Sequence, residues 1–378
     1  MPWQTKKLNE VCNLIKGKKP SRFVLKSNKP YLTARVVRNT EKPKFAAENC
    51  STSIWVKKED IVIIMDGSNS GEMFTGLSGA LASTMGIINY QKGLLNPKYL
   101  LHFLITHREN FTKSRTGAAI PHLNKEEFEN LDIPLPPLPE QHRIVKILDE
   151  VFEKMAKAKE NAEKNLKNAK ELFESYLQSI FSNKKWEEGN LSDVCDVEYG
   201  YTEKARSEGD YRFVRITDTD ENGLLAQEKK MYINYFKEAN KYILKDGDLL
   251  MARTGASAGN VLLFGGDEKA VFASYLIRMR FKKEIFSKLY WYFSKSKFYW
   301  DQVGQLSAGS AQPQFNGGAL KQIIFYYPKS LSEQKFIVKK LDTLSAETKK
   351  LEAIYKKKLA DLEELKKSVL KKALSGEL

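Results

Sequence analysis

The sequence of 378 residues repeats itself once, and this duplication constrains the fold more than any other feature. Residues near the start recur 183 positions later: Trp3, Leu8, Val11, Cys12 and Gly17 match Trp186, Leu191, Val194, Cys195 and Gly200. Further matches follow in the same order at offsets of 188, 192 and 193, as small insertions in surface loops would produce. An ordered series of this kind indicates a tandem duplication of about 190 residues.

Each half has the same predicted layout. Short apolar runs bounded by Gly, Ser and Asn, at residues 60–65 and 248–251, are typical of buried strands that end in turns. Each half then reaches a proline-bearing strand, at residues 133–139 and 323–328. Because proline cannot continue a strand ladder, we expect a new element to begin there.

A long amphipathic helix is predicted after each half. Apolar residues recur every 3.6 positions on average from 144 to 180 and, with one polar exception, from 337 to 373, and neither segment contains Pro or Gly. Helices of this length exceed those of ordinary globular domains and indicate a coiled coil. We expect the two helices to pair antiparallel, in a register that sets Ile144 against Ala373 and Ala162 against Tyr355.

These elements predict an α+β chain. Two similar mixed α/β domains would be separated by two long antiparallel helices that form a coiled coil, with pseudo-twofold symmetry. The predicted boundaries are 1–139 for the first domain, 140–182 for the central helix, 183–331 for the second domain and 332–378 for the C-terminal helix.

Composition narrows the class of function. The net charge of +15 favours a polyanionic partner, most often nucleic acid. Three cysteines cannot build a disulfide framework, and the four histidines show no zinc-like pairing with them. No apolar run approaches the roughly 18 residues that span a bilayer, and the first residues lack the apolar core of a signal peptide. We therefore expect a cytoplasmic protein with no membrane segment and no metal site.

Motifs of catalytic sites are missing, and we expect no catalytic residue. The sequence has no P-loop, no G-x-G turn and no Asn/Asp-Pro-Pro-aromatic tetrapeptide of adenine methyltransferases. A nuclease-like Glu-x-Lys triplet at 228–230 follows Asp218 and Asp220, which leaves a stand-alone DNA endonuclease as one alternative. A structural coiled-coil scaffold is the other alternative.

The chain resembles the specificity subunit of type I restriction–modification systems along essentially its whole length. The resemblance rests on motifs that occur twice in the same order. They are Trp-x4-Leu-x2-Val-Cys from Trp3 and Trp186, an apolar strand followed by Gly-x3-Gly at Gly67 and Gly255, Gly-x3-Pro-x2-Asn at Gly117 and Gly309, and Glu-Gln-x2-Ile at Glu140 and Glu333. The ending Leu374 to Leu378 also resembles the end of that family.

The resemblance implies a non-catalytic subunit whose two target-recognition domains read a bipartite site on double-stranded DNA. It also implies two methyltransferase subunits as partners, which transfer a methyl group from S-adenosylmethionine to adenine N6. Restriction subunits with motor and nuclease activity are further partners that the resemblance leaves open. No cofactor is expected in this chain itself.

Residues that contact DNA are expected in loops, because a side chain there can reach a groove edge. Arginine suits guanine, and asparagine or glutamine suits adenine. In the first half the candidates are Arg35, Arg38, Ser68, Asn69, Ser70, Arg115, His122 and Asn124. In the second half they are Arg215, Thr217, Arg253, Thr254, Ser257, Ser310, Gln312 and Gln314. The alternative for each is a solvated or turn-forming residue.

Two comparisons suggest that the two half-sites differ. His122 corresponds to Gln314, and we align Asp66 with Arg253. At the starts of the two long helices, Glu140, Gln141, Glu333 and Gln334 are candidates for binding partner subunits, with solvent exposure as the alternative.

Overall fold

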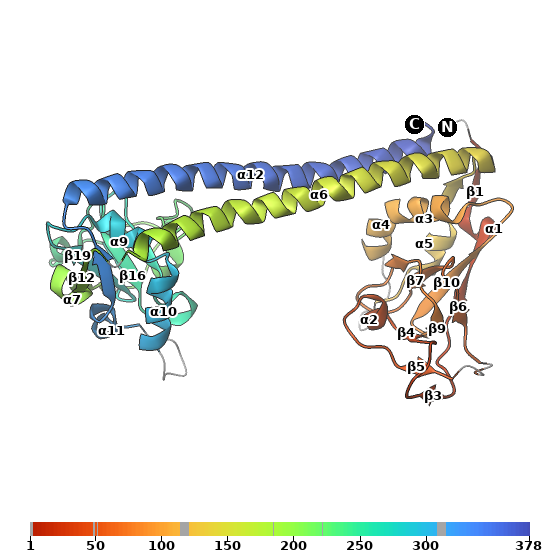
Figure 1. The fold of residues 1–378 in the computed structure, drawn as a ribbon, viewed down its shortest axis with the longest axis horizontal. Helices are drawn as coiled ribbons and strands as arrows, with labels where there is room; N and C mark the ends of the chain where they lie inside the picture. The colour runs from red at the N-terminus through yellow and green to blue at the C-terminus, as the bar shows by residue number, and fades with distance from the viewer. Residues whose placement is uncertain are drawn as a thin grey trace. The chain divides into compact units, whose positions relative to one another are not determined.

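The computed structural model describes residues 3–47, 50, 52–113, 121–183, 185–220, 222–307 and 315–378. The chain divides into two compact units, Met1–Glu163 with Lys357–Leu378, and Lys164–Lys356. Each unit contains one globular part and a portion of both long helices, so each is described by itself (Figure 1).

The first globular part is built around a four-stranded antiparallel sheet with the order β2-β10-β7-β8. Its elements are β1 (Thr5–Lys7), α1 (Leu8–Val11), β2 (Cys12–Lys16), β3 (Phe23–Val24), β4 (Tyr31–Leu32), α2 (Ala34–Val37), β5 (Phe45–Ala46), β6 (Trp55–Val56), β7 (Ile61–Ile64), β8 (Met73–Phe74), β9 (Gly79–Leu81), β10 (Met85–Tyr90), α3 (Pro97–Thr106), α4 (Arg108–Lys113), α5 (Lys125–Glu129) and β11 (Asp132–Pro134). Smaller sheets pair β1 with β11, β3 with β5, and order β4-β9-β6.

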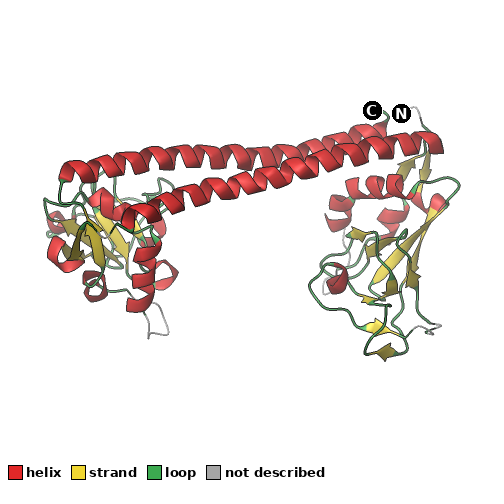
Figure 2. Cartoon of the chain, viewed as in Figure 1, coloured by secondary structure: helices red, strands yellow, loops and turns green. Residues whose placement is uncertain are grey.

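The second globular part repeats this plan with the sheet order β13-β19-β16-β17. Figure 2 shows strands and short helices together in this part, as in the first. Its elements are β12 (Glu187–Asn190), α7 (Leu191–Val194), β13 (Cys195–Tyr199), β14 (Tyr211–Val214), η1 (Ile216–Asp218), β15 (Tyr232–Ile233), α8 (Ala239–Tyr242), β16 (Leu249–Ala252), η2 (Gly255–Ser257), β17 (Val261–Leu263), β18 (Ala270–Phe272), β19 (Leu276–Phe281), α9 (Ser287–Phe293), α10 (Lys297–Leu306), α11 (Gly317–Lys321) and β20 (Ile324–Tyr327). Strand β12 pairs with β20 as β1 does with β11, and a third sheet has the order β15-β14-β18. The shared strand order confirms the duplication.

The recurring glycines mark one close approach of the backbone in each copy. A Cβ atom added to Gly17 would lie 2.2 Å from the carbonyl oxygen of Ala82, and one added to Gly200 would lie 2.3 Å from that of Ala273. No side chain fits at such a distance, so the loop that follows β2 or β13 requires glycine at this point. This constraint explains why the residue recurs in the sequence.

The apolar run of β7 is continuous because both faces of the sheet are covered. Ile61 and Ile63 pack into a cluster with α3 and the long helices, whereas Val62 and Ile64 pack into a second cluster with β4, β6 and β9. Strand β16 repeats this pattern, since Leu249 shares the cluster with α9 and the long helices and its neighbours pack on the other face. A strand buried on both faces loses the alternation of polar and apolar residues.

The long helices are α6 (Leu138–Phe181) and α12 (Leu331–Ser375). In the first unit they run antiparallel: Ile144, near the start of α6, shares a cluster with Ala373, near the end of α12, and Lys159 Nζ lies 2.8 Å from Glu363 Oε1. In the second unit Leu172 and Tyr176 of α6 line a groove together with Thr343, Leu344 and Glu347 of α12, so the helices lie side by side there. The ribbon in Figure 1 runs antiparallel through this pair as well. The predicted antiparallel pairing is thus confirmed within each unit.

The exact register of the helix pair stays a prediction, although residues that it sets opposite each other share an environment within one unit. Ile144 and Ala373 lie in one cluster, and Ala169 and Thr348, which the same register sets opposite each other, are both buried. The pairing of Ala162 with Tyr355 stays a prediction, because the two residues belong to different units. Among the described residues, no helix combines the length and apolar character that crossing a membrane requires.

Candidate nucleic-acid interface

The turn after β7 is joined to the segment that precedes α5. The N–H of Gly67 donates to the carbonyl oxygen of Pro121 at 2.7 Å, and the N–H of Leu123 donates to that of Met65 at 2.8 Å. Gly67 has a φ of +104°, a conformation that residues with a Cβ rarely adopt. The structure therefore brings together two loops that the sequence analysis chose separately.

Asp66 holds two basic side chains at one end of this turn. Its carboxylate accepts a hydrogen bond from His122 Nδ1 at 2.8 Å and another from Lys16 Nζ at 3.2 Å. Burial raises the pKa of Asp66, but the hydrogen bonds from His122 and Lys16 outweigh it, so the pKa lies below its ordinary value. The side chains of His122 and Lys16 remain about half exposed, at 49% and 53%.

Glu72 does the same at the other end of the turn. Its two carboxylate oxygens lie 3.1 Å from Arg38 Nε and 3.0 Å from Arg108 NH2. Only 19% of the Glu72 side chain is exposed, whereas both arginines are largely at the surface. Two carboxylates thus fix four basic side chains on a rim around the turn, which we call the basic rim: Lys16, Arg38, Arg108 and His122.

The sequence analysis found half of the basic rim. Arg38 and His122 were candidates, but Lys16 and Arg108 were missed, because neither lies in a turn that the motifs mark. The signal for Lys16 was its place directly before the recurring Gly17. Arg108 has no such signal, since only the fold brings the first residue of α4 to Glu72.

The other first-half candidates divide by exposure. Arg35 in α2 and Ser68 in the turn are exposed, and Asn69 is half-buried, so all three are open to a ligand. Ser70 is fully buried, which argues against direct contact with DNA. Arg115 lies outside the residues that the structure describes.

Asn124 has a structural role as the N-cap of α5. Its Oδ1 accepts a hydrogen bond from the N–H of Glu127 at 3.2 Å. Asn316 caps α11 in the same way, accepting from the N–H of Ala319 at 3.0 Å. The asparagine of the repeated Gly-x3-Pro-x2-Asn motif is therefore explained by helix capping, although Asn124 is half-buried and its contact with DNA stays a prediction.

The turn after β16 makes the same backbone contacts in the second part. The N–H of Phe315 donates to the carbonyl oxygen of Arg253 at 2.8 Å, just as Leu123 donates to Met65. Arg253 thus corresponds to Met65, and Thr254 corresponds to Asp66. The sequence alignment of Asp66 with Arg253 was wrong by one residue, although the glycines that follow, Gly67 and Gly255, already set Asp66 against Thr254.

Arg253 rests on an aromatic ring. Its guanidinium carbon lies 5.2 Å from the centroid of the Tyr199 ring, and the Tyr199 hydroxyl accepts a hydrogen bond from the N–H of Gly317 at 3.0 Å. Tyr199 pairs with Ile277 as Lys16 pairs with Gly86, so Tyr199 and Lys16 occupy equivalent positions. The sequence analysis missed Tyr199. The available signal was its position, because Tyr199 lies 183 residues after Lys16, at the offset of the repeat.

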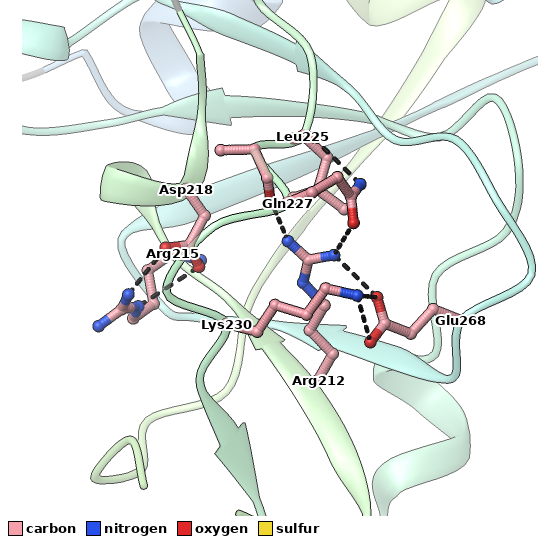
Figure 3. A network of polar contacts seen from close by, with 8 residues as sticks. Arg212, Arg215, Asp218, Leu225, Gln227, Lys230 and Glu268 are labelled. Carbon is pink, nitrogen blue, oxygen red and sulfur yellow. Dashed lines mark hydrogen bonds and ion pairs between the residues drawn. The ribbon is translucent and has the colours of Figure 1, made fainter. Parts of the chain in front are cut away.

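Arg215 is fixed by a carboxylate beside a second, buried arginine. Its NH2 and Nε donate to the two oxygens of Asp218 at 2.8 and 3.3 Å. Figure 3 shows Arg215 turned toward Asp218, whereas Arg212 points into a separate network with Gln227 and Glu268. Arg215 keeps about a third of its side chain exposed.

The remaining second-half candidates lie at the surface or outside the description. Thr217 is exposed next to Arg215, and Thr254 and Ser257 are half-buried in the turn that contains η2. Three further candidates lie outside the described residues: Ser310, Gln312 and Gln314.

Comparison with known proteins identifies the family. The model of the type I restriction modification DNA specificity domain matches residues 1–167 and again residues 183–362. The chain belongs to this family.

Relatives cover the whole length of the chain. The type I restriction enzyme MjaVIII specificity subunit of Methanocaldococcus jannaschii is 30% identical over 405 residues, which cover 100% of this chain and 93% of the relative. The StySPI specificity subunit of Salmonella potsdam is 25% identical, with coverage of 100% and 89%.

Two solved structures share the fold. The crystal structure of the HsdS subunit from Thermoanaerobacter tengcongensis matches with a TM-score of 0.60 at 19% identity, covering 100% of this chain and 98% of that one. A chain from a structural study of complex assembly and conformational transition of the type I R-M system matches with a TM-score of 0.79 at 18% identity, with coverage of 100% and 99%.

As a member of the specificity-subunit family, the chain is a DNA-recognition subunit and not an enzyme. The side chains around the nuclease-like triplet at residues 228–230 are engaged in other contacts or exposed. Asp218 is engaged by Arg215, Lys230 Nζ pairs with Glu268 at 3.1 Å, and Glu228 is exposed. Within the described residues, no three His, Cys, Asp or Glu side chains gather in an arrangement that could hold a metal ion.

The partner-binding prediction was wrong for Gln141. This side chain is fully buried and ties α6 to its own globular part. Its Oε1 accepts from the N–H of Asn96 at 2.8 Å, and its Nε2 donates to the carbonyl oxygens of Leu94 and Pro136, both at 2.9 Å. Buried in this way, Gln141 offers nothing to another subunit.

Gln334 repeats the arrangement at the start of α12. The prediction that Gln334 binds a partner subunit was wrong for the same reason. It is fully buried, accepts from the N–H of Phe286 at 2.8 Å, and donates to the carbonyl oxygens of Glu284 at 2.9 Å and Pro328 at 2.8 Å.

The two glutamates remain candidates for partner binding. Glu333 is exposed, and Glu140 is half-buried in a bidentate pair with Arg143, with both distances 2.7 Å.

Proposed function

We propose that this specificity subunit reads a bipartite site on double-stranded DNA and positions two adenine-N6 methyltransferase subunits on it. The observation that carries the proposal is the pair of equivalent turns, each fixed by the same backbone contacts but furnished with different side chains. Lys16, Met65 and Asp66 in the first part correspond to Tyr199, Arg253 and Thr254 in the second.

Equivalent scaffolds with unlike side chains are suited to reading two different half-sites. Backbone contacts hold each turn in place, and the side chains that it carries determine the base preference. Two copies in one chain then give one recognition event for each half of the target. One methyltransferase for each recognition part would place a catalytic centre on each strand, with S-adenosylmethionine bound by the methyltransferase.

The basic rim supports nucleic acid as the ligand. Carboxylates with little exposure orient cations that remain at the surface, and the net charge of the chain is +15. A structural scaffold without a nucleic-acid partner leaves the rim unexplained. Phosphate contacts of such cations make affinity fall steeply with salt. The proposed complex acts on DNA in the cytoplasm. Restriction subunits are the further partners that the resemblance leaves open, and the proposal does not depend on them.

Exchange of one globular part tests the bipartite site. Residues 1–139 are replaced by the matching segment of a relative with a different target, while α12 and α6 from Glu140 onward are kept. Gln141 bonds only to backbone groups of the first part, so its three hydrogen bonds do not depend on the side chains that are exchanged. We expect one half of the methylated sequence to change completely and the other half to stay, as read by mapping N6-methyladenine in cells.

The reciprocal exchange of residues 183–331 is the matched control, and it is expected to change the other half only. A chimera whose two half-sites both change, or neither, contradicts the assignment of one half-site to each part.

Glu72→Gln tests whether the basic rim contributes to discrimination. The amide keeps the shape of the side chain but releases Arg38 and Arg108 from a shared charge. We expect the affinity ratio between target and random duplex to fall about fivefold, with affinity for random duplex unchanged or higher at low salt. Titration of both duplexes at two salt concentrations measures this ratio.

Glu109→Gln is the control, because it removes one negative charge from an exposed carboxylate that pairs with Lys367. Equal effects of the two variants would show that only net charge matters, which contradicts a role for the rim in discrimination.

A further inference from the structure

Arg253 is held differently from the other arginines in the interior of the second globular part. Arg212, Arg215 and Arg278 are buried or half-buried, and each forms an ion pair with a carboxylate. Arg253 is also half-buried, but among the described residues no carboxylate lies within ion-pair distance of its guanidinium. The Tyr199 ring takes the place of the counter-ion.

Hydrogen bonds hold both the backbone of Arg253 and the aromatic ring beneath its guanidinium. The N–H of Arg253 donates to the carbonyl oxygen of Tyr275 at 3.0 Å, and its own carbonyl oxygen accepts from Phe315 at 2.8 Å. The Tyr199 ring is anchored in turn through its hydroxyl to the N–H of Gly317. Both the backbone of Arg253 and the ring beneath its head group are therefore fixed before any ligand arrives.

A guanidinium that lies on an aromatic ring keeps its N–H groups available for hydrogen bonds to a ligand. A cation over an aromatic face is attracted by the ring as a whole, so the N–H groups in the guanidinium plane are not consumed. A carboxylate partner, as at Arg215, occupies two of them. Within the described part of the chain, the Arg253 side chain donates no hydrogen bond. With 44% of Tyr199 and 60% of Tyr275 exposed, the site lies at the surface.

We propose that Arg253 reads a guanine in the half-site of the second globular part, by a bidentate hydrogen bond to O6 and N7. The inference rests on the proposed function and adds the identity of one base. A planar fork held in one orientation matches the two acceptors on the major-groove edge of guanine. The equivalent residue of the first part is Met65, which has no donor, so the first half-site lacks this contact at the matching position.

The test uses the full chain assembled with its methyltransferase subunits and the target sequence that methylation mapping defines. Each guanine of the second half-site is replaced in turn by 7-deazaguanine, which lacks the N7 acceptor. We expect one position at which this change weakens binding of the wild-type complex about tenfold or more. Arg253→Met, which installs the residue of the first copy, is expected to weaken binding to the normal target by a similar factor and to be insensitive to 7-deazaguanine at that position.

Two further variants separate the effect of the planar guanidinium of Arg253 from the effect of its positive charge. Arg253→Lys keeps the positive charge, and we expect it to retain affinity for random duplex but to lose the sensitivity to 7-deazaguanine. Arg206→Ala removes an exposed charge from the same globular part, and we expect it to weaken all duplexes equally while the sensitivity remains. Because the DNA substitutions are made against the wild-type complex, a misfolded variant does not prevent the test.

The outcomes distinguish the two levels of the proposal. A wild-type complex that binds target and random duplex equally well overturns the proposed function itself. A wild-type complex that discriminates but tolerates 7-deazaguanine at every guanine of the second half-site overturns only the role of Arg253. Loss of affinity by Arg253→Met to the same extent on every duplex, with affinity retained by Arg253→Lys, would instead assign Arg253 to a phosphate.

Discussion

Gln141→Leu is expected to lower the free energy of unfolding of the first unit by about 4 kcal/mol. Leucine fits the volume, but it leaves one N–H and two carbonyl groups of the backbone without their partner, at the half-buried Asn96 and Leu94 and the buried Pro136. Each buried polar group that loses its hydrogen bond costs about 1–3 kcal/mol, and partial relaxation reduces the sum. The decrease in the free energy of unfolding of this unit is measured by urea unfolding, with hydrogen exchange in peptides from α3 and β11 as the readout.

The second copy offers an internal comparison. Gln334→Leu is expected to destabilise the second unit by a similar amount, because Gln334 makes the same three bonds. Glu333→Ala, one residue earlier and exposed, is the control and should change stability by no more than about 0.5 kcal/mol. If Gln141→Leu and Gln334→Leu were as stable as this control, the role of the glutamines in fixing each helix to its globular part would be refuted.

Gly17→Ala is expected to lower the free energy of unfolding of the first unit by about 3 kcal/mol. The new methyl group would lie 2.2 Å from a carbonyl oxygen of the Ala82 backbone, so either the loop after β2 or the segment after β9 must move. Backbone atoms cannot rotate away as a flexible side chain can, which places the cost at the upper end of the usual range for overpacking. Chemical denaturation of the variant and the wild type measures the difference.

Gly93→Ala is the matched control for this change. An added Cβ at Gly93 meets nothing within 4 Å, and its φ is not in the left-handed region. We expect stability to be unchanged or to rise by up to about 1 kcal/mol, because alanine restricts the unfolded chain. Equal stabilities of the two variants would mean that the close approach at Gly17 relaxes freely.

The duplication, the buried strands and the two long helices could be predicted from the sequence, because each depends on local patterns. A continuous apolar run followed by glycine specifies β7 or β16 wherever the strand ends up in the fold. A period of 3.6 over ten turns likewise specifies a helix with one apolar face. Even the burial of Gln141 had a signal, since it lies three residues before Ile144 on that face.

The candidate site was only partly predictable, because its chemistry depends on residues that are distant in the chain. Asp66 meets Lys16 and His122, which lie 50 positions before it and 56 after it, and no local pattern records that meeting. The correspondence of Arg253 with Met65 likewise became visible only through the backbone bonds that join each turn to a distant segment. Local periodicity thus determined which elements form, whereas tertiary packing decided which side chains share a carboxylate, a ring or a buried glutamine.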